Sequence, residues 1–138
     1  MADVILDLDP KSPIPLYLQI VEQVRRLLAL GVLQAGDRFL TVRELGATAR
    51  VNRNTAARAV TEMERAGLVR TRVGQGTFIA ASASHISTEK RDATLDAAIE
   101  SLLVEAHALG VPQEELGWRI QRKLEQFARA RRDREKES

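Results

Sequence analysis

The stretch TVRELGATARVNRNTAARAVTEMERAG, residues 41–67, decides the fold. Residues 41–44 match a capping box, in which the threonine hydroxyl accepts a hydrogen bond from the third amide and the glutamate reaches back. A short helix is expected to follow, to about Ala49. Asn52 is a good N-cap for a second helix, which ends at Gly67. The stretch therefore predicts two consecutive helices separated by a short break.

Another helix is expected before this stretch. Residues 16–30 carry apolar side chains at helical spacing, and Pro15 suits a first helical position. This helix should stop near Gly31, and residues 34–37 are typical of a turn.

After Gly67 the periodicity becomes strand-like. Two short β-rich runs, 68–73 and 77–80, flank a Gly-Gln-Gly turn and predict a hairpin. Three helices followed by a hairpin are typical of a winged helix-turn-helix, so the fold is expected to be mainly α with a small β-hairpin wing. Its expected core residues are Tyr17, Ile20, Val24, Val60, Met63 and Phe78.

Two more amphipathic helices are expected beyond a linker of small residues. The Gly-Val-Pro link between them is so short that they should form an antiparallel two-helix hairpin. The expected domains are a winged helix at 10–81, a linker at 82–91, a helical dimerisation domain at 92–132 and a fraying charged tail at 133–138.

The apolar stripe of these last two helices has two interpretations, packing on the first domain or dimerisation. We favour a homodimer, because a two-helix hairpin cannot hide both apolar faces and an exposed apolar patch implies a partner. The expected interface residues are Leu95, Ile99, Leu102, Leu103, Ala106, Leu116, Ile120, Leu124 and Phe127. Trp118 lies off this stripe, as a second contact surface or as one wall of an effector pocket.

Positive charge is concentrated around the deciding stretch. Residues 38–72 hold eight arginines and three acids, whereas the whole chain has a net charge of only +2. The planar guanidinium group of arginine presents donors that match phosphate oxygens and the edge of guanine. A basic surface of this kind can also simply be solvated. At 100° per residue, Arg53, Asn54 and Arg58 lie opposite the small core side of the second helix. That face would reach bases in the major groove of double-stranded DNA.

Composition argues against several other classes of protein. The 138 residues include no cysteine, which excludes disulfides and thiolate metal sites. Two distant histidines, His85 and His107, are too few for a metal site, and no nucleophile has a matching base. We expect no metal, no cofactor and no enzyme activity. The longest apolar run is about seven residues and the N-terminus is acidic, so a cytoplasmic protein without a membrane span is expected.

Six blocks in this order resemble the GntR family of bacterial transcription regulators. The blocks are PLYLQI (15–20), AGDR (35–38), TVREL (41–45), NRNT (52–55), ERAGLV (64–69) and GQGTFI (74–79). The short two-helix tail is similar to that of the YtrA subfamily. The resemblance implies a homodimeric repressor on an inverted-repeat operator, often near genes for an ABC transporter.

The resemblance also implies which residues touch DNA. Arg43 matches a family arginine that contacts DNA, and Gly76 matches the wing-tip glycine. The expected DNA-binding residues are Thr41, Arg43, Asn52, Arg53, Asn54, Thr55, Arg58, Gln75, Gly76 and Thr77. Leu40 stands where the family usually has proline. Ala57 and Gln75 stand where the family often has arginine and lysine, so the usual family operator is not implied.

Two other functions stay open. One is an architectural or non-specific DNA-binding protein, and the other is a protein-binding winged helix. Arg53 and Asn54 on the groove-facing turn argue against the second. A steep preference for one site over bulk DNA would distinguish a regulator from an architectural protein. A small-molecule effector is not specified, because a tail of about 57 residues leaves little room for a pocket of the usual size.

Overall fold

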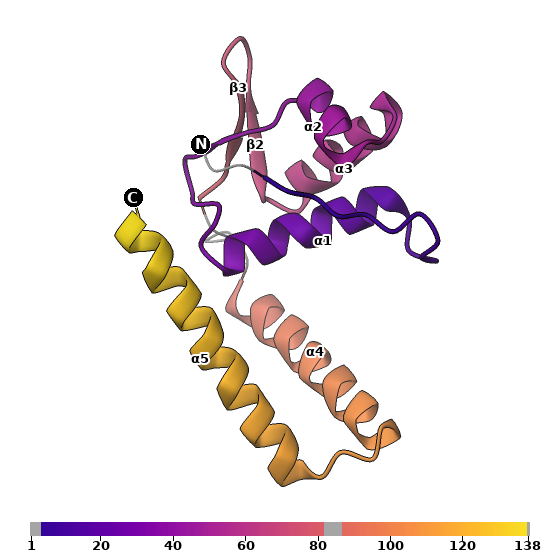
Figure 1. Ribbon diagram of the computed structural model, residues 1–138, viewed down its shortest axis with the longest axis vertical. Coiled ribbons are helices and arrows are strands. Elements are labelled where there is room, and N and C mark those ends of the chain that lie inside the picture. Colours follow the sequence, from indigo (N-terminus) through magenta and orange to yellow (C-terminus); the bar gives the residue numbers. More distant parts are fainter. Residues whose placement is uncertain (1–3, 82–86, 138) are drawn as a thin grey trace.

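The computed structural model describes residues 4–81 and 87–137 (Figure 1). Its elements, in chain order, are α1 (Leu16–Ala29), β1 (Arg38–Phe39), α2 (Val42–Ala49), α3 (Arg53–Arg65), β2 (Val69–Arg72), β3 (Gly76–Ile79), α4 (Thr88–Ala108) and α5 (Gln113–Glu137). The fold is mainly helical with one small antiparallel sheet, which confirms the expected winged helix-turn-helix followed by two helices.

Two side-chain caps set the start of α2 and the start of α3. The Glu44 amide donates to Thr41 Oγ1 at 3.2 Å, and the Thr41 amide donates to Glu44 Oε1 at 3.2 Å. At α3 the Thr55 amide donates to Asn52 Oδ1 at 2.8 Å. Both caps were predicted, because the hydroxyl and amide side chains satisfy amides that lack helical partners. Between the helices, Arg50 takes the left-handed conformation, with φ of 57°.

The first three helices and the sheet enclose one apolar core. Ile20 and Val24 on α1 and Met63 on α3 are fully buried there, and Leu45 joins them from α2. The expected core is thus largely confirmed, although Tyr17 is only partly buried at its edge.

The domain begins earlier than residue 10. Leu6 belongs to the core, and the backbone of the segment before α1 is held by two glutamines of that helix. Gln23 accepts from the Asp7 amide at 2.9 Å and donates to the Asp7 carbonyl at 2.6 Å, while Gln19 accepts from the Asp9 amide at 2.8 Å. These bonds satisfy backbone groups of an extended segment whose apolar residues Val4, Leu6 and Leu8 pack on the core of the domain.

The sheet has three strands in the order β1-β3-β2, whereas the sequence predicted only the β2–β3 hairpin. Arg38 of β1 and Arg70 of β2 both lie opposite Phe78 of β3. Residues alternate between the faces of a strand, so Thr77 and Ile79 point to the core and Phe78 points outward. Placing Phe78 in the core was therefore wrong by one residue of register.

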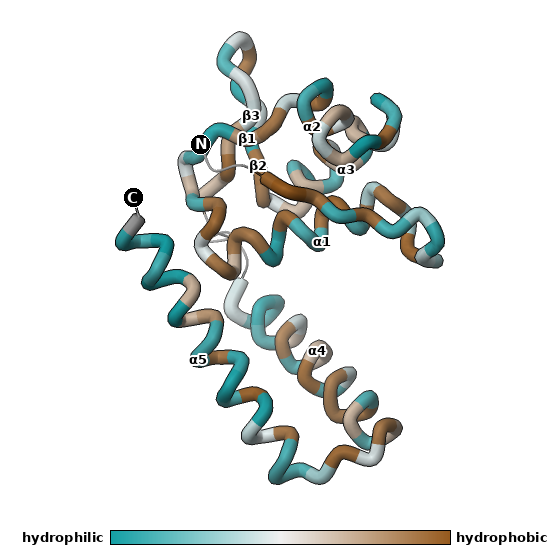
Figure 2. Tube along the Cα trace, in the orientation of Figure 1, coloured by the Kyte–Doolittle hydropathy of each residue, from teal (hydrophilic) through white to brown (hydrophobic). Residues whose placement is uncertain are grey.

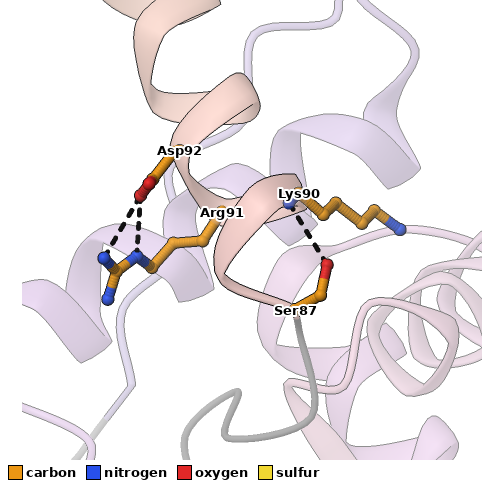
Figure 3. A network of polar contacts seen from close by, with 4 residues as sticks. All are labelled: Ser87, Lys90, Arg91 and Asp92. Carbon is orange, nitrogen blue, oxygen red and sulfur yellow. Dashed lines mark hydrogen bonds and ion pairs between the residues drawn. The ribbon is translucent and has the colours of Figure 1, made fainter.

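The tail helices are longer than expected. α4 begins at Thr88, inside the expected linker, because the Lys90 amide donates to Ser87 Oγ at 3.2 Å and caps the helix (Figure 3). Figure 3 also shows the 3.2 Å ion pair between Arg91 and Asp92 in the first turn. At the other end, α5 runs through the expected fraying tail to Glu137, since its Arg, Glu and Lys residues have high helix propensity. Residues 82–86 of the expected linker lie outside the described residues.

The two tail helices diverge from the turn at Gly110, and the last part of α5 returns to the first domain (Figure 1). A Cβ placed on Gly31 would lie 3.4 Å from the Cα of Arg131, so this end of α5 lies against the end of α1. Within the described residues, no helix is long and apolar enough to cross a membrane.

Candidate nucleic-acid interface

The start of α3 and the start of α2 place three expected DNA-contacting side chains at the surface. Arg53 and Asn54 occupy the first turn of α3 and are exposed, and Arg43 is exposed on the first turn of α2. Arg43 and Arg53 line one groove of about 510 Å³ between the two helices. The structure thus brings together two cations that are ten positions apart in the chain, at the end of α3 that enters a major groove in this motif.

The buried side of α3 explains how this helix is held. Its buried residues are Ala56, Ala59, Val60 and Met63, as the helical periodicity predicted. Two alanines on that side let α3 pack closely on its neighbours, which include α1 and α2. On α2, a Cβ at Gly46 would lie only 3.3 Å from the carbonyl oxygen of Val51. The helix-turn-helix is therefore closely packed, and its outward side chains project from a rigid support.

Thr41, Asn52 and Thr55 hold the helix ends. Thr41 and Asn52 each use a side-chain oxygen to cap the following helix, and the cap of α3 ends on the Thr55 amide. The N-terminal amides and the helix dipole favour negative charge at these two ends. These residues can thus serve an interface with phosphate by orienting helix ends as well as by direct contact.

The same cap shifts the ionisation of Glu44. The hydrogen bonds from the Thr41 backbone and then from its hydroxyl hold the pKa of Glu44 below its usual value of 4.5, and the positive charge of Arg38 adds to this effect. Glu44 is therefore a carboxylate at neutral pH, and this carboxylate accepts the hydrogen bond from the Thr41 amide that caps α2.

Arg58 lies over an aromatic ring that the sequence did not connect with it. Its guanidinium carbon is 4.1 Å from the centre of the Tyr17 ring, which belongs to α1. Such stacking holds the guanidinium in one place while leaving its edges free for hydrogen bonds. The spacing of the two residues along the chain carries no signal of this contact, because it arises from the packing of α1 on α3.

The wing presents two of its three expected contact residues. Gln75 is exposed at the tip, where its backbone amide donates to the Arg72 carbonyl at 3.0 Å. Gly76 takes a φ of 115°, a conformation that favours glycine. Thr77 is different: it is only 6% exposed, and its side chain points to the core. The Thr77 side chain is therefore covered within the domain, and the expected DNA contact of this residue stays a prediction.

Comparison with known proteins gives the family. The sequence model of "Bacterial regulatory proteins, gntR family" matches residues 16–79. The HTH-type transcriptional repressor YtrA of Bacillus subtilis strain 168 is 34% identical over 111 residues, which cover 80% of this chain and 85% of the relative. The chain belongs to the GntR family. It is a DNA-binding transcriptional regulator and not an enzyme.

Two further similarities extend beyond the helix-turn-helix. The HTH-type transcriptional regulator YhcF of Bacillus subtilis strain 168 is 41% identical over 106 residues, which cover 77% of this chain and 87% of YhcF. A solved structure described as a transcriptional antiterminator from Listeria monocytogenes EGD-e is 31% identical, with a TM-score of 0.76. That similarity covers 90% of this chain and 92% of the Listeria chain. The likeness therefore includes the two tail helices.

The tail of this GntR-family chain leaves most of its expected interface residues exposed. The exposed fractions lie between 41% and 59% for Leu95, Ile99, Leu102, Leu103, Ile120 and Leu124. Leu116 and Phe127 are half-buried. Ala106 is only 7% exposed within the single chain, so it offers little surface to a partner, and its place in the interface stays a prediction. Trp118 is 56% exposed, and the centre of its ring lies 4.8 Å from the guanidinium carbon of Arg122.

Other candidate sites are few in the described part of the chain. No cluster of three or more potential metal ligands occurs there. His107 is exposed in the last turn of α4, and His85 lies outside the described residues. Sequence reasoning missed two contacts between an arginine and an aromatic ring in the DNA-binding domain. Arg58 lies over Tyr17 because α1 packs on α3, and Arg72 of β2 lies over Phe78 of β3 because of the register of the hairpin.

Proposed function

We propose that this chain is a homodimeric repressor that binds an inverted-repeat operator, with one half-site for each subunit. The observation that carries the proposal is the exposed pair Arg53 and Asn54 at the start of α3, where Arg53 lines one groove together with Arg43. Arginine pairs with guanine and asparagine with adenine through two hydrogen bonds. A single helix contacts only a few base pairs, so an operator of useful length calls for two subunits.

In this proposal, residues 4–81 form the DNA-binding domain and α4 and α5 form the dimerisation domain. Arg53 and Asn54 contact bases, while Arg43, Arg58, Gln75 and the Gly76 backbone contact phosphates. The exposed apolar residues of α4 and α5 support dimerisation, since an apolar surface of this extent favours a protein partner. A regulator of transcription acts where the chromosome is, so we place the protein in the cytoplasm.

Repression is proposed because YtrA, a similar protein along most of both chains, is named a repressor. Transporter genes are the first targets to test, following the family resemblance. The second candidate function is architectural binding without base preference. It is favoured by the eight arginines of residues 38–72, which would bind any duplex.

Selection from a random DNA pool tests the two candidates. The proposed function predicts a consensus with two inverted half-sites. Arg53→Ala should weaken binding to that operator by about 1–3 kcal/mol and flatten the preference at one base pair per half-site. Arg65→Ala is the matched control, because Arg65 is exposed at the other end of α3, where it pairs with Glu62 at 3.3 Å. Equal weakening by Arg53→Ala on operator and random DNA would favour the architectural function.

A further inference from the structure

The outer face of the sheet gathers three arginines around one ring. Arg38 on β1 and Arg70 on β2 are the direct neighbours of Phe78 on β3, one on each side. Arg72 follows Arg70 by two positions and therefore projects from the same face. Thr77 and Ile79 turn to the core, so this face carries no part of the hydrophobic core.

Two of these arginines lie along the sheet toward the tip of the wing. The guanidinium carbon of Arg72 is 4.9 Å from the centre of the Phe78 ring. The guanidinium of Arg38 passes beside Gly76, since a Cβ there would lie 3.5 Å from Arg38 Nε and 3.8 Å from one Nη. The half-buried Phe78 ring thus supports the guanidinium group of Arg72, and Gly76, which has no side chain, leaves room for that of Arg38.

This cluster carries excess positive charge, although Arg38 is close enough to the Glu44 carboxylate to help lower the pKa of Glu44. Within residues 4–81 and 87–137, none of the three wing arginines forms an ion pair shorter than 4.0 Å, unlike Arg65, Arg91 and Arg119. Arg38, Arg70 and Arg72 are all exposed. Like charges held on one small face repel one another, and an anionic partner relieves that repulsion.

The position of the face points to one partner. The β2–β3 hairpin projects beyond the helices on the side where α2 lies, so that the wing and the start of α2 share one end of the domain (Figure 1). DNA bound by the start of α3 would continue past this hairpin. Its backbone carries one phosphate charge about every 1.7 Å of helix axis, a density suited to several arginines side by side.

We propose that Arg38, Arg70 and Arg72, arranged around Phe78, bind the phosphate backbone of DNA beside the base pairs contacted by α3. This inference rests on the proposed DNA-binding orientation of α3. The three arginines supply positive charge to a wing whose tip carries Gln75 and to a domain whose recognition helix carries Ala57. Phe78 is a positioning residue, because it acts through the guanidinium stacked on it.

Charge-removing variants of the full-length protein test the phosphate contacts. Arg38→Gln, Arg70→Gln and Arg72→Gln should each weaken binding roughly threefold to tenfold, by the same factor on the selected operator and on random DNA. The triple variant should lower the slope of log affinity against log salt by about 0.9 for each phosphate that the protein no longer neutralises. Arg122→Gln is the matched control, because Arg122 also lies over a ring, that of Trp118 at 4.8 Å, but belongs to α5.

Phe78 gives a test at constant charge. Phe78→Leu should weaken binding to both DNAs while Phe78→Tyr keeps wild-type affinity, with thermal unfolding showing that both variants are folded. A triple variant with the affinity and salt slope of Arg122→Gln would overturn the proposal, and so would a loss confined to the selected operator. Failure of the selection to return inverted half-sites would contradict the proposed function instead, because the effect of the wing is also measured on random DNA.

Discussion

The DNA-binding domain buries many of its apolar residues, whereas the tail leaves many of its own exposed. In the DNA-binding domain, Ile20, Leu45 and Met63 are 0% exposed. In the tail, Leu95 on α4 and Leu124 on α5 are 58% and 59% exposed. The first region completes a hydrophobic core within one chain, whereas the second leaves apolar surface exposed, which is the surface that the proposed dimer would cover. In our proposal, the first region therefore determines the fold of the monomer and the second determines the assembly.

The exposed apolar surface of the tail is also wider than one stripe. Hydrophobic residues follow α4 for most of its length (Figure 2). Val104 is 71% exposed and Leu109 is 70% exposed, and neither belongs to the expected interface. A helix that is apolar around much of its circumference is normally buried on several sides. The proposed dimer is therefore expected to enclose α4 more completely than a simple two-helix contact would.

The largest effect should come from charging the tail surface. Leu102→Glu with Leu124→Glu should split the dimer, because the carboxylates would lie unpaired in an apolar interface. Affinity for the two-half-site operator should then fall by about 10²–10⁴-fold, since each half-site is bound independently. Sedimentation gives the mass and gel-shift titration gives the affinity. Ser101→Glu with Gln126→Glu, on the same helices but off the stripe, is the control. If the variant with both leucines replaced by glutamate stays dimeric, the tail is not the dimer interface.

The next prediction distinguishes the two regions by how the loss of stability depends on protein concentration. Met63→Ala should lower the free energy of unfolding by about 2–5 kcal/mol, because it opens a cavity in a fully buried position. Urea unfolding at two protein concentrations should give the same loss at both. Leu124→Ala should instead destabilise the protein by an amount that depends on concentration, since Leu124 is buried only in the proposed dimer. The same loss from Leu124→Ala at both concentrations would contradict this division of roles between the two regions.

A disulfide can test where the two regions meet. A Cβ on Gly31 would lie 3.6 Å from the Cβ of Arg131, within the range of disulfides, and the chain has no cysteine of its own. Gly31→Cys with Arg131→Cys should oxidise within one chain, and the disulfide should stabilise this variant by roughly 2–4 kcal/mol relative to its reduced form. Gly67→Cys with Arg131→Cys is the control, because Gly67 has the same φ of 76° but an open surrounding. A covalent dimer on a non-reducing gel would place α5 on the partner's domain.

The smallest effect concerns the cap of α2. Because the folded state holds the pKa of Glu44 below its usual value of 4.5, the cap contributes its full stability above that value and loses it as the pH falls through the lowered pKa. The glutamine of Glu44→Gln keeps a hydrogen-bond acceptor without the charge. The variant should therefore approach the wild-type melting temperature as the pH falls. Parallel melting curves from pH 7 to pH 3 would show that Glu44 has no such role.

Much of the fold and site could be predicted from local patterns. The caps at Thr41 and Asn52 involve neighbours only three residues away, so the sequence contains the whole interaction. The buried side of α3 follows from helical periodicity in the same way. The face of Thr77 could not be predicted, because a strand of four residues is too short to show which of its alternate positions is covered.

The sequence by itself determined the helix-turn-helix, the hairpin and the places where each helix begins in the first domain, because caps, glycines and periodicity act over a few residues. Tertiary structure decided which distant residues meet. Strand β1 forms only because β3 is there to pair with it, Arg58 finds Tyr17 because α1 packs on α3, and Arg38, Arg70 and Arg72 surround Phe78 because three strands align in one register. Such contacts join residues that no local interaction connects, so only the packing of the whole domain determines them.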